Sequence, residues 1–174
     1  MDEPRAVEPD TKDWTVVIRE GCRECGFDPA FDVRATGDRL RATEPAWREV
    51  LARADARERP QPATWSPLEY AAHSRDVLRV MRERLEQMLA TDGATFDSWD
   101  QDAAAVSARY DLQDPARVAQ EYAEQVAVTA AAFDAVEDGQ WHHRGSRAGT
   151  GFTVGTLAVY LVHDIEHHLH DVAR

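Results

Sequence analysis

The clearest candidates for chemistry are four of the seven histidines, which lie together in the C-terminal segment 163–170. His163 and His167 are four residues apart, a spacing that places both rings on one face of a helix, one turn from each other. Two imidazoles in this arrangement can bind one divalent metal ion. The alternative is a polar helix face whose histidines pair with neighbouring acidic residues. A third possible ligand elsewhere in the sequence would favour the metal site over this alternative.

His73 is the candidate for that third ligand. It follows a helix-start signature, in which Ser66 is the N-cap, Pro67 the first helical residue and Glu69 the third. On this helix His73 shares an arc with Val77, so its ring is expected on the inner side. A histidine in this position is either a hydrogen-bonded core residue or a ligand. Together with the C-terminal pair, it would give three imidazoles that leave part of a metal ion open to water or substrate.

Two cysteines form a second candidate motif. Cys22 and Cys25 are separated by two residues and followed by Gly26, as in one half of a zinc ribbon, but the sequence contains no second CxxC. Three interpretations remain open at this point. The cysteines form a structural zinc site completed by histidines such as His142 and His143, they are a redox dithiol, or they shape a turn.

The segment 141–151 is rich in glycine and contains two arginines, Arg144 and Arg147. A guanidinium group can bind a carboxylate through two parallel hydrogen bonds, and glycine lets the backbone approach a ligand closely. The segment is therefore either part of a ligand-binding site or an ordinary flexible connection between helices.

Four long amphipathic helices are predicted to position these residues. The first is expected within 32–57, the second from Pro67 to about Ala90, the third from Pro115 to before Asp138, and the last after Thr153 as N-cap. A loop with a short helix is expected within 96–110, and the short run Trp14–Ile18 is expected to be extended. These elements predict an all-α four-helix bundle over residues 32–174, preceded by an N-terminal tail and an extended CxxC-containing segment over residues 1–31.

Composition narrows the classes of partner. The net charge is −12 and the sequence has no basic run, so we expect no nucleic-acid binding. There is no apolar run of the roughly 18 residues that span a bilayer, and no signal-peptide core, so we expect no membrane association and a cytoplasmic protein with reduced cysteines. Trp99 and Trp141 are expected to be exposed aromatic residues, which favours a homodimer.

The pattern resembles the DinB/YfiT-like superfamily of four-helix bundles. The residues that carry the resemblance are Trp65-Ser-Pro-Leu-Glu69-Tyr-Ala-Ala-His73 and His163-Asp-Ile-Glu-His167-His168, and the resemblance covers roughly residues 32 to 174. It implies that His73, His163 and His167 bind a metal, most commonly zinc, with nickel as the alternative. His168 and Asp171 also resemble a His-x-x-Asp continuation in the branch that includes mycothiol-dependent maleylpyruvate isomerase. There the first member of the C-terminal pair is a glutamate, where this chain has His163.

The resemblance further implies a metal-dependent transferase or isomerase that uses a low-molecular-weight thiol, such as mycothiol, on a small electrophilic substrate. In this interpretation Arg144 or Arg147 contacts an anionic part of a ligand, and Asp164 or Glu166 orients the metal ligands. Two alternatives stay open: a metal-dependent hydrolase, and a stress protein that binds a metal or a small molecule without catalysis.

Overall fold

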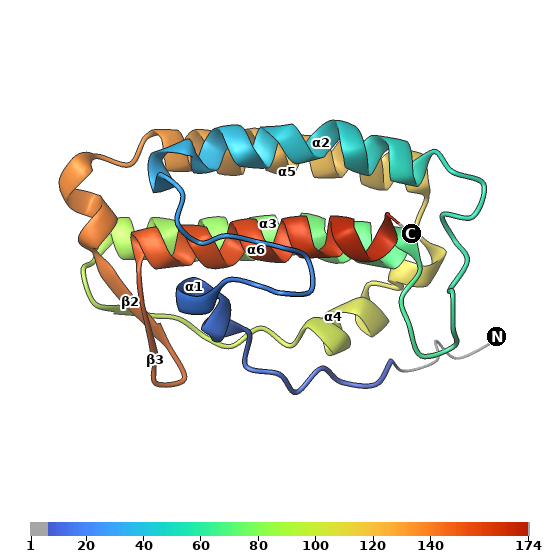
Figure 1. Cartoon of the computed structure of the whole chain (residues 1–174), viewed down its shortest axis with the longest axis horizontal. Coiled ribbons are helices and arrows are strands. Elements are labelled where there is room, and N and C mark those ends of the chain that lie inside the picture. The colour runs from blue at the N-terminus through green and yellow to red at the C-terminus, as the bar shows by residue number, and fades with distance from the viewer. Residues whose placement is uncertain (1–6, 174) are drawn as a thin grey trace.

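The computed structural model describes residues 7–173, so residues 1–6 of the expected tail and Arg174 lie outside the described part. Four long helices lie side by side in the bundle of Figure 1: α2 (Thr36–Leu51), α3 (Pro67–Ala90), α5 (Pro115–Asp134) and α6 (Val154–Val172). The predicted four-helix bundle is therefore present. None of the helices in the described part is long and apolar enough to cross a membrane.

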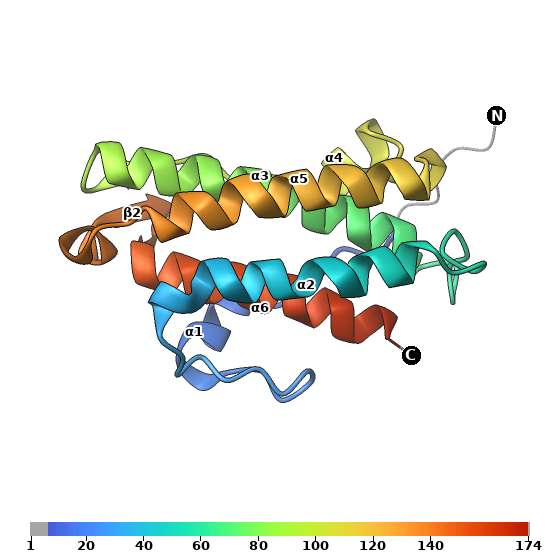
Figure 2. The same ribbon diagram turned by 90° about the horizontal axis from the view of Figure 1, so that it is seen from above.

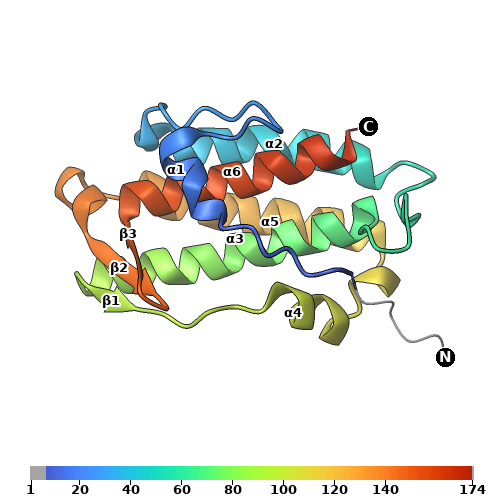
Figure 3. The same cartoon turned by 60° about the horizontal axis from the view of Figure 1, so that its bottom comes forward.

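The first two long helices of the chain, α2 and α3, are not the main neighbours of each other in the bundle. The principal contacts of α2 and of α3 are with α5 and α6, so α2 and α3 face each other diagonally (Figure 2). α2 and α6 run in one direction, and α3 and α5 run in the other (Figure 1). The crossover between α3 and α5 includes α4 (Gln101–Ser107) and the short 3-10 helix η3 (Tyr110–Leu112). This crossover runs along one side of α3 (Figure 3), where it closes part of the site described below.

Local sequence signals explain where the helices begin. Ser66 Oγ accepts a hydrogen bond from the backbone N–H of Glu69, and the Glu69 carboxylate accepts one from the N–H of Ser66, so the predicted capping box is present. Asp114 caps α5 directly before its predicted start at Pro115, and Thr153 caps α6 as expected. Buried apolar side chains on the inner faces, including Trp47, Leu78, Phe133 and Leu161, form the core that holds the helices together.

A small sheet corrects the all-α prediction. Strands β2 (Arg144–Arg147) and β3 (Thr150–Thr153) form an antiparallel hairpin in the segment expected to be a loop, and β1 (Ala94–Thr95) pairs with β2 in parallel. The turn of the hairpin has left-handed residues at Ala148 and Gly149. The hairpin packs closely on α3. A Cβ added at Gly145 would lie only 2.7 Å from side-chain atoms of Met88 and Phe96.

The expectation of an extended run at Trp14–Ile18 was wrong. Residues Trp14–Val16 form a 3-10 helix, η1, and Val17–Glu20 form α1, which packs beside α6 (Figure 3). Asp13 starts this turn by accepting a hydrogen bond from the N–H of Thr15. Another 3-10 turn, η2 (Val33–Ala35), leads into α2, and η4 (Asp138–His142) lies between α5 and the hairpin. The N-terminal segment is thus folded against the bundle.

Candidate functional site

Helix α6 carries histidine and aspartate side chains that can bind a metal, and these side chains face two different parts of the fold. Successive residues on a helix differ by about 100° in direction, so the pair His163 and His167 faces a different side from the pair Asp164 and His168. Two groups of possible metal ligands result, each with ligand atoms within 4.8 Å of one another. The histidine–aspartate group consists of His73, Asp164 and His168, and the cysteine–histidine group consists of Cys22, Cys25, His163 and His167.

In the histidine–aspartate group, one carboxylate oxygen lies between two imidazoles. Asp164 Oδ1 is 3.6 Å from Nε2 of His73 and 3.5 Å from Nε2 of His168, and it has no hydrogen-bond partner among the described residues. Ligand atoms about 2.0–2.2 Å from a tetrahedral ion lie about 3.3–3.6 Å from one another. The separations are too long for hydrogen bonds and match those of ligands around a shared ion, so the three residues fit a divalent metal.

Asp171 holds His168 in the orientation that this site needs. Its carboxylate accepts a hydrogen bond from Nδ1 of His168 at 3.3 Å, which leaves Nε2 to face Asp164. Metal-binding histidines commonly donate their second ring N–H to a carboxylate, which fixes the tautomer and raises the basicity of the ligand. Burial lowers the pKa of His168, but Asp171 and Asp164 outweigh it and raise that pKa.

The ionisation states of His73 and Asp164 suit a metal. Burial lowers the pKa of His73, which is only 1% exposed, so its ring stays neutral. Burial opposes ionisation of Asp164, but the contact with His73 and the nearby ring of His168 outweigh it and lower its pKa to about 2. A neutral imidazole and an ionised carboxylate are the forms that bind divalent ions.

A cavity of about 380 Å³ opens beside Asp164 and His168. Its wall comes from three separate parts of the chain: the N-terminal segment with Asp10, Lys12 and Trp14, the crossover with Trp99, Asp100, Gln101 and Asp102, and the helices with Tyr70, Tyr160, His163, Asp164, His167, His168 and Asp171. Trp99 also stacks on His73 with ring centroids 5.7 Å apart. This lining could not be predicted from the sequence, since its parts converge only in the folded protein.

The structure divides the three histidines that were expected to share an ion. His73 belongs to the histidine–aspartate group, whereas His163 and His167 face the two cysteines. Asp164, expected to orient ligands, and His168, noted for its spacing to Asp171, stand beside His73 instead. The signal was present in the sequence, because Asp164 and His168 have the same i,i+4 spacing as the histidine pair.

The cysteines lie beside His163 and His167. His142 and His143, which were predicted to complete a zinc site with the cysteines, are not part of this group. His143 Nδ1 instead lies 3.0 Å from the carbonyl oxygen of Met88. Cys22 and Cys25 are free thiols, and burial raises the pKa of the Cys25 thiol to about 11.

Other predicted binding residues lie outside the cavity wall. Arg144 is exposed and forms an ion pair with Asp92 at 3.2 Å, while the Arg147 guanidinium lies over the rings of Phe152 and Tyr160.

Glu166, Trp141 and Trp99 make contacts other than those predicted for them. Glu166 was considered as a residue that orients ligands, but it accepts two hydrogen bonds from Arg39, at 2.9 and 2.6 Å. Trp141 is buried against Phe133, and Trp99 covers His73, so these aromatic residues do not form the exposed surface on which a homodimer was expected.

Comparisons with known proteins agree with this architecture. The solved structure of YfiT from Bacillus subtilis superposes with a TM-score of 0.64 over 97% of this chain and 93% of that chain, at 14% sequence identity. That protein is described as "a probable metal-dependent hydrolase with an unusual four-helix bundle topology". The comparison with curated proteins gave no significant match. The family model of the DinB superfamily matches residues 36–172, which contain all four long helices. The chain therefore belongs to the DinB superfamily.

Proposed function

We propose that the protein is a metal-dependent hydrolase of a small molecule, with its ion bound by His73, Asp164 and His168. The observation that carries this proposal is the convergence of three donors at separations that suit a shared ion, and two of these donors, Asp164 and His168, line a cavity. Three protein ligands leave a position for water or substrate, as in catalytic zinc sites. The description of YfiT, which has the same fold, supports the same class of reaction.

The residues around the proposed site have distinct roles. A divalent ion bound there supplies Lewis acidity, which lowers the pKa of water and polarises a carbonyl group. Asp164 provides negative charge, and Asp171 keeps the proton of His168 on Nδ1 so that Nε2 can bind. Asp102 lines the same cavity, and burial, followed by the nearby Asp100, raises its pKa. It is therefore placed to exchange a proton with a substrate.

The charge of the cavity wall suggests a substrate class. Among the residues that line the cavity, Lys12 is the one lysine or arginine, against four other carboxylates besides Asp164: Asp10, Asp100, Asp102 and Asp171. This wall favours a neutral or cationic substrate over an anionic one. Arg144 and Arg147 are not needed for binding in this proposal.

A thiol-dependent transferase or isomerase is the second candidate, and one observation favours it. With Asp164 in the ligand group, the spacing Asp164-x3-His168-x2-Asp171 has a carboxylate in the first position of the pair. The mycothiol-dependent isomerase branch has a glutamate there. The same ion would then stabilise a thiolate as the attacking group.

Turnover with and without a thiol distinguishes the candidates. The protein would be loaded with zinc or nickel and assayed against neutral and cationic esters and amides, then against electrophiles with added mycothiol. We expect thiol-independent hydrolysis that is lost in Asp164→Asn and kept in Glu166→Gln, a matched change on the same helix. Turnover only with the thiol would favour the transferase, and metal binding without turnover in either assay would contradict both and favour the non-catalytic binding protein.

A further inference from the structure

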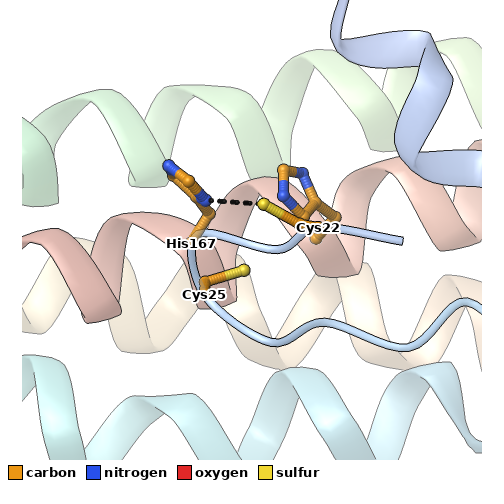
Figure 4. Close-up of side chains that lie close together, drawn as sticks. Cys22, Cys25 and His167 are labelled. Atoms are coloured by element: carbon orange, nitrogen blue, oxygen red, sulfur yellow. Dashed lines mark hydrogen bonds between the residues drawn. The ribbon is translucent and has the colours of Figure 1, made fainter. Parts of the chain in front are cut away.

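The cysteine–histidine group lies outside the ligand set of the proposed hydrolase, and its cysteines precede the segment that matches the DinB family. Cys22 and Cys25 come from the turn after α1, and Figure 4 shows them beside His167 of α6. His163 lies one turn earlier on the same helix. The group therefore joins the N-terminal segment to the last helix of the bundle.

The distances within the group suit a tetrahedral zinc ion. Sγ of Cys22 lies 3.6 Å from Nδ1 of His167, a contact that the dashed line in Figure 4 marks. Sulfur and nitrogen ligands at about 2.3 and 2.0–2.1 Å from a tetrahedral zinc ion lie about 3.5–3.6 Å apart. Nε2 of His163 is buried and has no hydrogen-bond partner among the described residues. A buried donor atom without a partner is costly, and a metal ion would satisfy it.

The backbone of the cysteine segment has the form of a zinc knuckle. The N–H of Gly26 donates to the carbonyl oxygen of Cys22 at 2.8 Å, and the N–H of Cys22 donates to that of Phe27 at 3.0 Å. Gly26 has a φ of +77°, a conformation that favours glycine directly after the second cysteine. The turn presents both thiols to one side, which is the function of a CxxC-Gly segment in zinc sites.

The surroundings favour a structural site over a reactive one. Cys22, His163 and His167 are 6%, 3% and 7% exposed, and the rings of Trp14 and Phe27 pack on the histidines. Nε2 of His167 faces the carboxylates of Asp171 and Glu24 at 3.7 and 3.9 Å, which suits a second ring nitrogen that carries a proton. Four protein ligands also occupy all four coordination positions of a tetrahedral ion, which leaves no position for substrate.

We propose that the cysteine–histidine group is a structural zinc site that fastens the N-terminal segment to α6. Because Asp10, Lys12 and Trp14 in this segment line the cavity, the zinc ion also holds one wall of the proposed active site in place. This inference does not depend on the reaction, since it uses none of the residues proposed to bind the catalytic ion.

Cobalt substitution tests the proposal, because the histidine–aspartate group contains no sulfur. Metal-free protein would be titrated with Co²⁺ under reducing conditions. We expect one equivalent to give the thiolate-to-cobalt charge-transfer band and the intense visible absorption of tetrahedral cobalt. The charge-transfer band should be lost in the double variant Cys22→Ser, Cys25→Ser and kept in His168→Ala. Since the wild-type spectrum alone is informative, a variant that fails to fold does not leave the proposal untested.

Three results would overturn the site. They are cobalt binding to the wild type without a thiolate band, an unchanged visible spectrum in the double variant His163→Ala, His167→Ala, and a Cys22–Cys25 disulfide in protein purified without reductant. Zinc removal with a chelator should also make the chain more sensitive to limited proteolysis between residues 7 and 31, and re-addition of zinc should restore protection. An N-terminal segment equally resistant in both states would contradict the fastening role. Loss of hydrolysis with an intact thiolate band would concern the proposed function alone.

Discussion

His167 and His168 are neighbours in the chain, yet their rings point to different ligand groups. Nδ1 of His167 lies 3.6 Å from Sγ of Cys22, and Nε2 of His168 lies 3.5 Å from Oδ1 of Asp164. Asp171 stands beside both rings, 3.7 Å from Nε2 of His167 and 3.3 Å from Nδ1 of His168. One turn of α6 thus serves a proposed structural ion and a proposed catalytic ion through a shared carboxylate.

The change His168→Ala should remove a ligand of the catalytic ion and leave the zinc site intact. We expect the metal affinity of the histidine–aspartate group to fall by more than about 100-fold. The loss of a residue that only supports a metal ligand already lowers metal affinity by about 10–100-fold. Competition with a chelating dye measures this affinity. His170→Ala, on the same helix and outside both groups, is the control, and an equal loss in both variants would count against the assignment.

The change Asp171→Asn should weaken both sites without removing a ligand. We expect a loss of about 10–100-fold in metal affinity at each site, because the asparagine keeps the size of the side chain but not the negative charge behind the rings. Metal-binding titrations of the double variant Cys22→Ser, Cys25→Ser, with and without Asp171→Asn, isolate the effect on the histidine–aspartate group. Unchanged affinity there would show that Asp171 does not support His168.

Acid should destabilise the metal-free protein through His163. Burial, followed by the nearby His167, lowers the pKa of His163 from 6.5 to about 4. Between these values the unfolded chain binds more protons than the folded chain, so the free energy of unfolding falls as the pH falls through this window. Urea unfolding at several pH values measures the slope. His163→Gln should flatten it, and an unchanged slope in that variant would contradict the role of His163.

Gly145→Ala should destabilise the contact between the hairpin and α3. A Cβ at this position would lie 2.7 Å from Met88 Cγ and from Phe96 Cε1, so both side chains would have to move. We expect a loss of about 1–3 kcal/mol in the free energy of unfolding, as for other overpacked sites. Thermal unfolding should show a Tm lower by roughly 2–4 °C per kcal/mol. Gly151→Ala in the neighbouring strand is the control, because nothing lies within 4 Å of its added Cβ.

The sequence by itself determined the four long helices and the starting points of the last three. Ser66, Asp114 and Thr153 act through hydrogen bonds to residues three positions away, so their effect can be predicted without knowing the fold. Helical periodicity also placed His73 on a buried face, where the structure has it. The sheet was missed because β1 has two residues and is defined by its pairing with a hairpin about 50 residues later.

Only the tertiary structure decided which residues stand together at each candidate site. The pair His163 and His167 and the pair Asp164 and His168 have identical spacing, so either pair could have faced His73. The rotation of α6 about its axis makes this choice, and a shift of one residue changes the direction of every side chain by about 100°. The packing of α6 against α2 and α3 fixes that rotation, and the fold of the N-terminal turn then brings Cys22 and Cys25 to the histidines that remain.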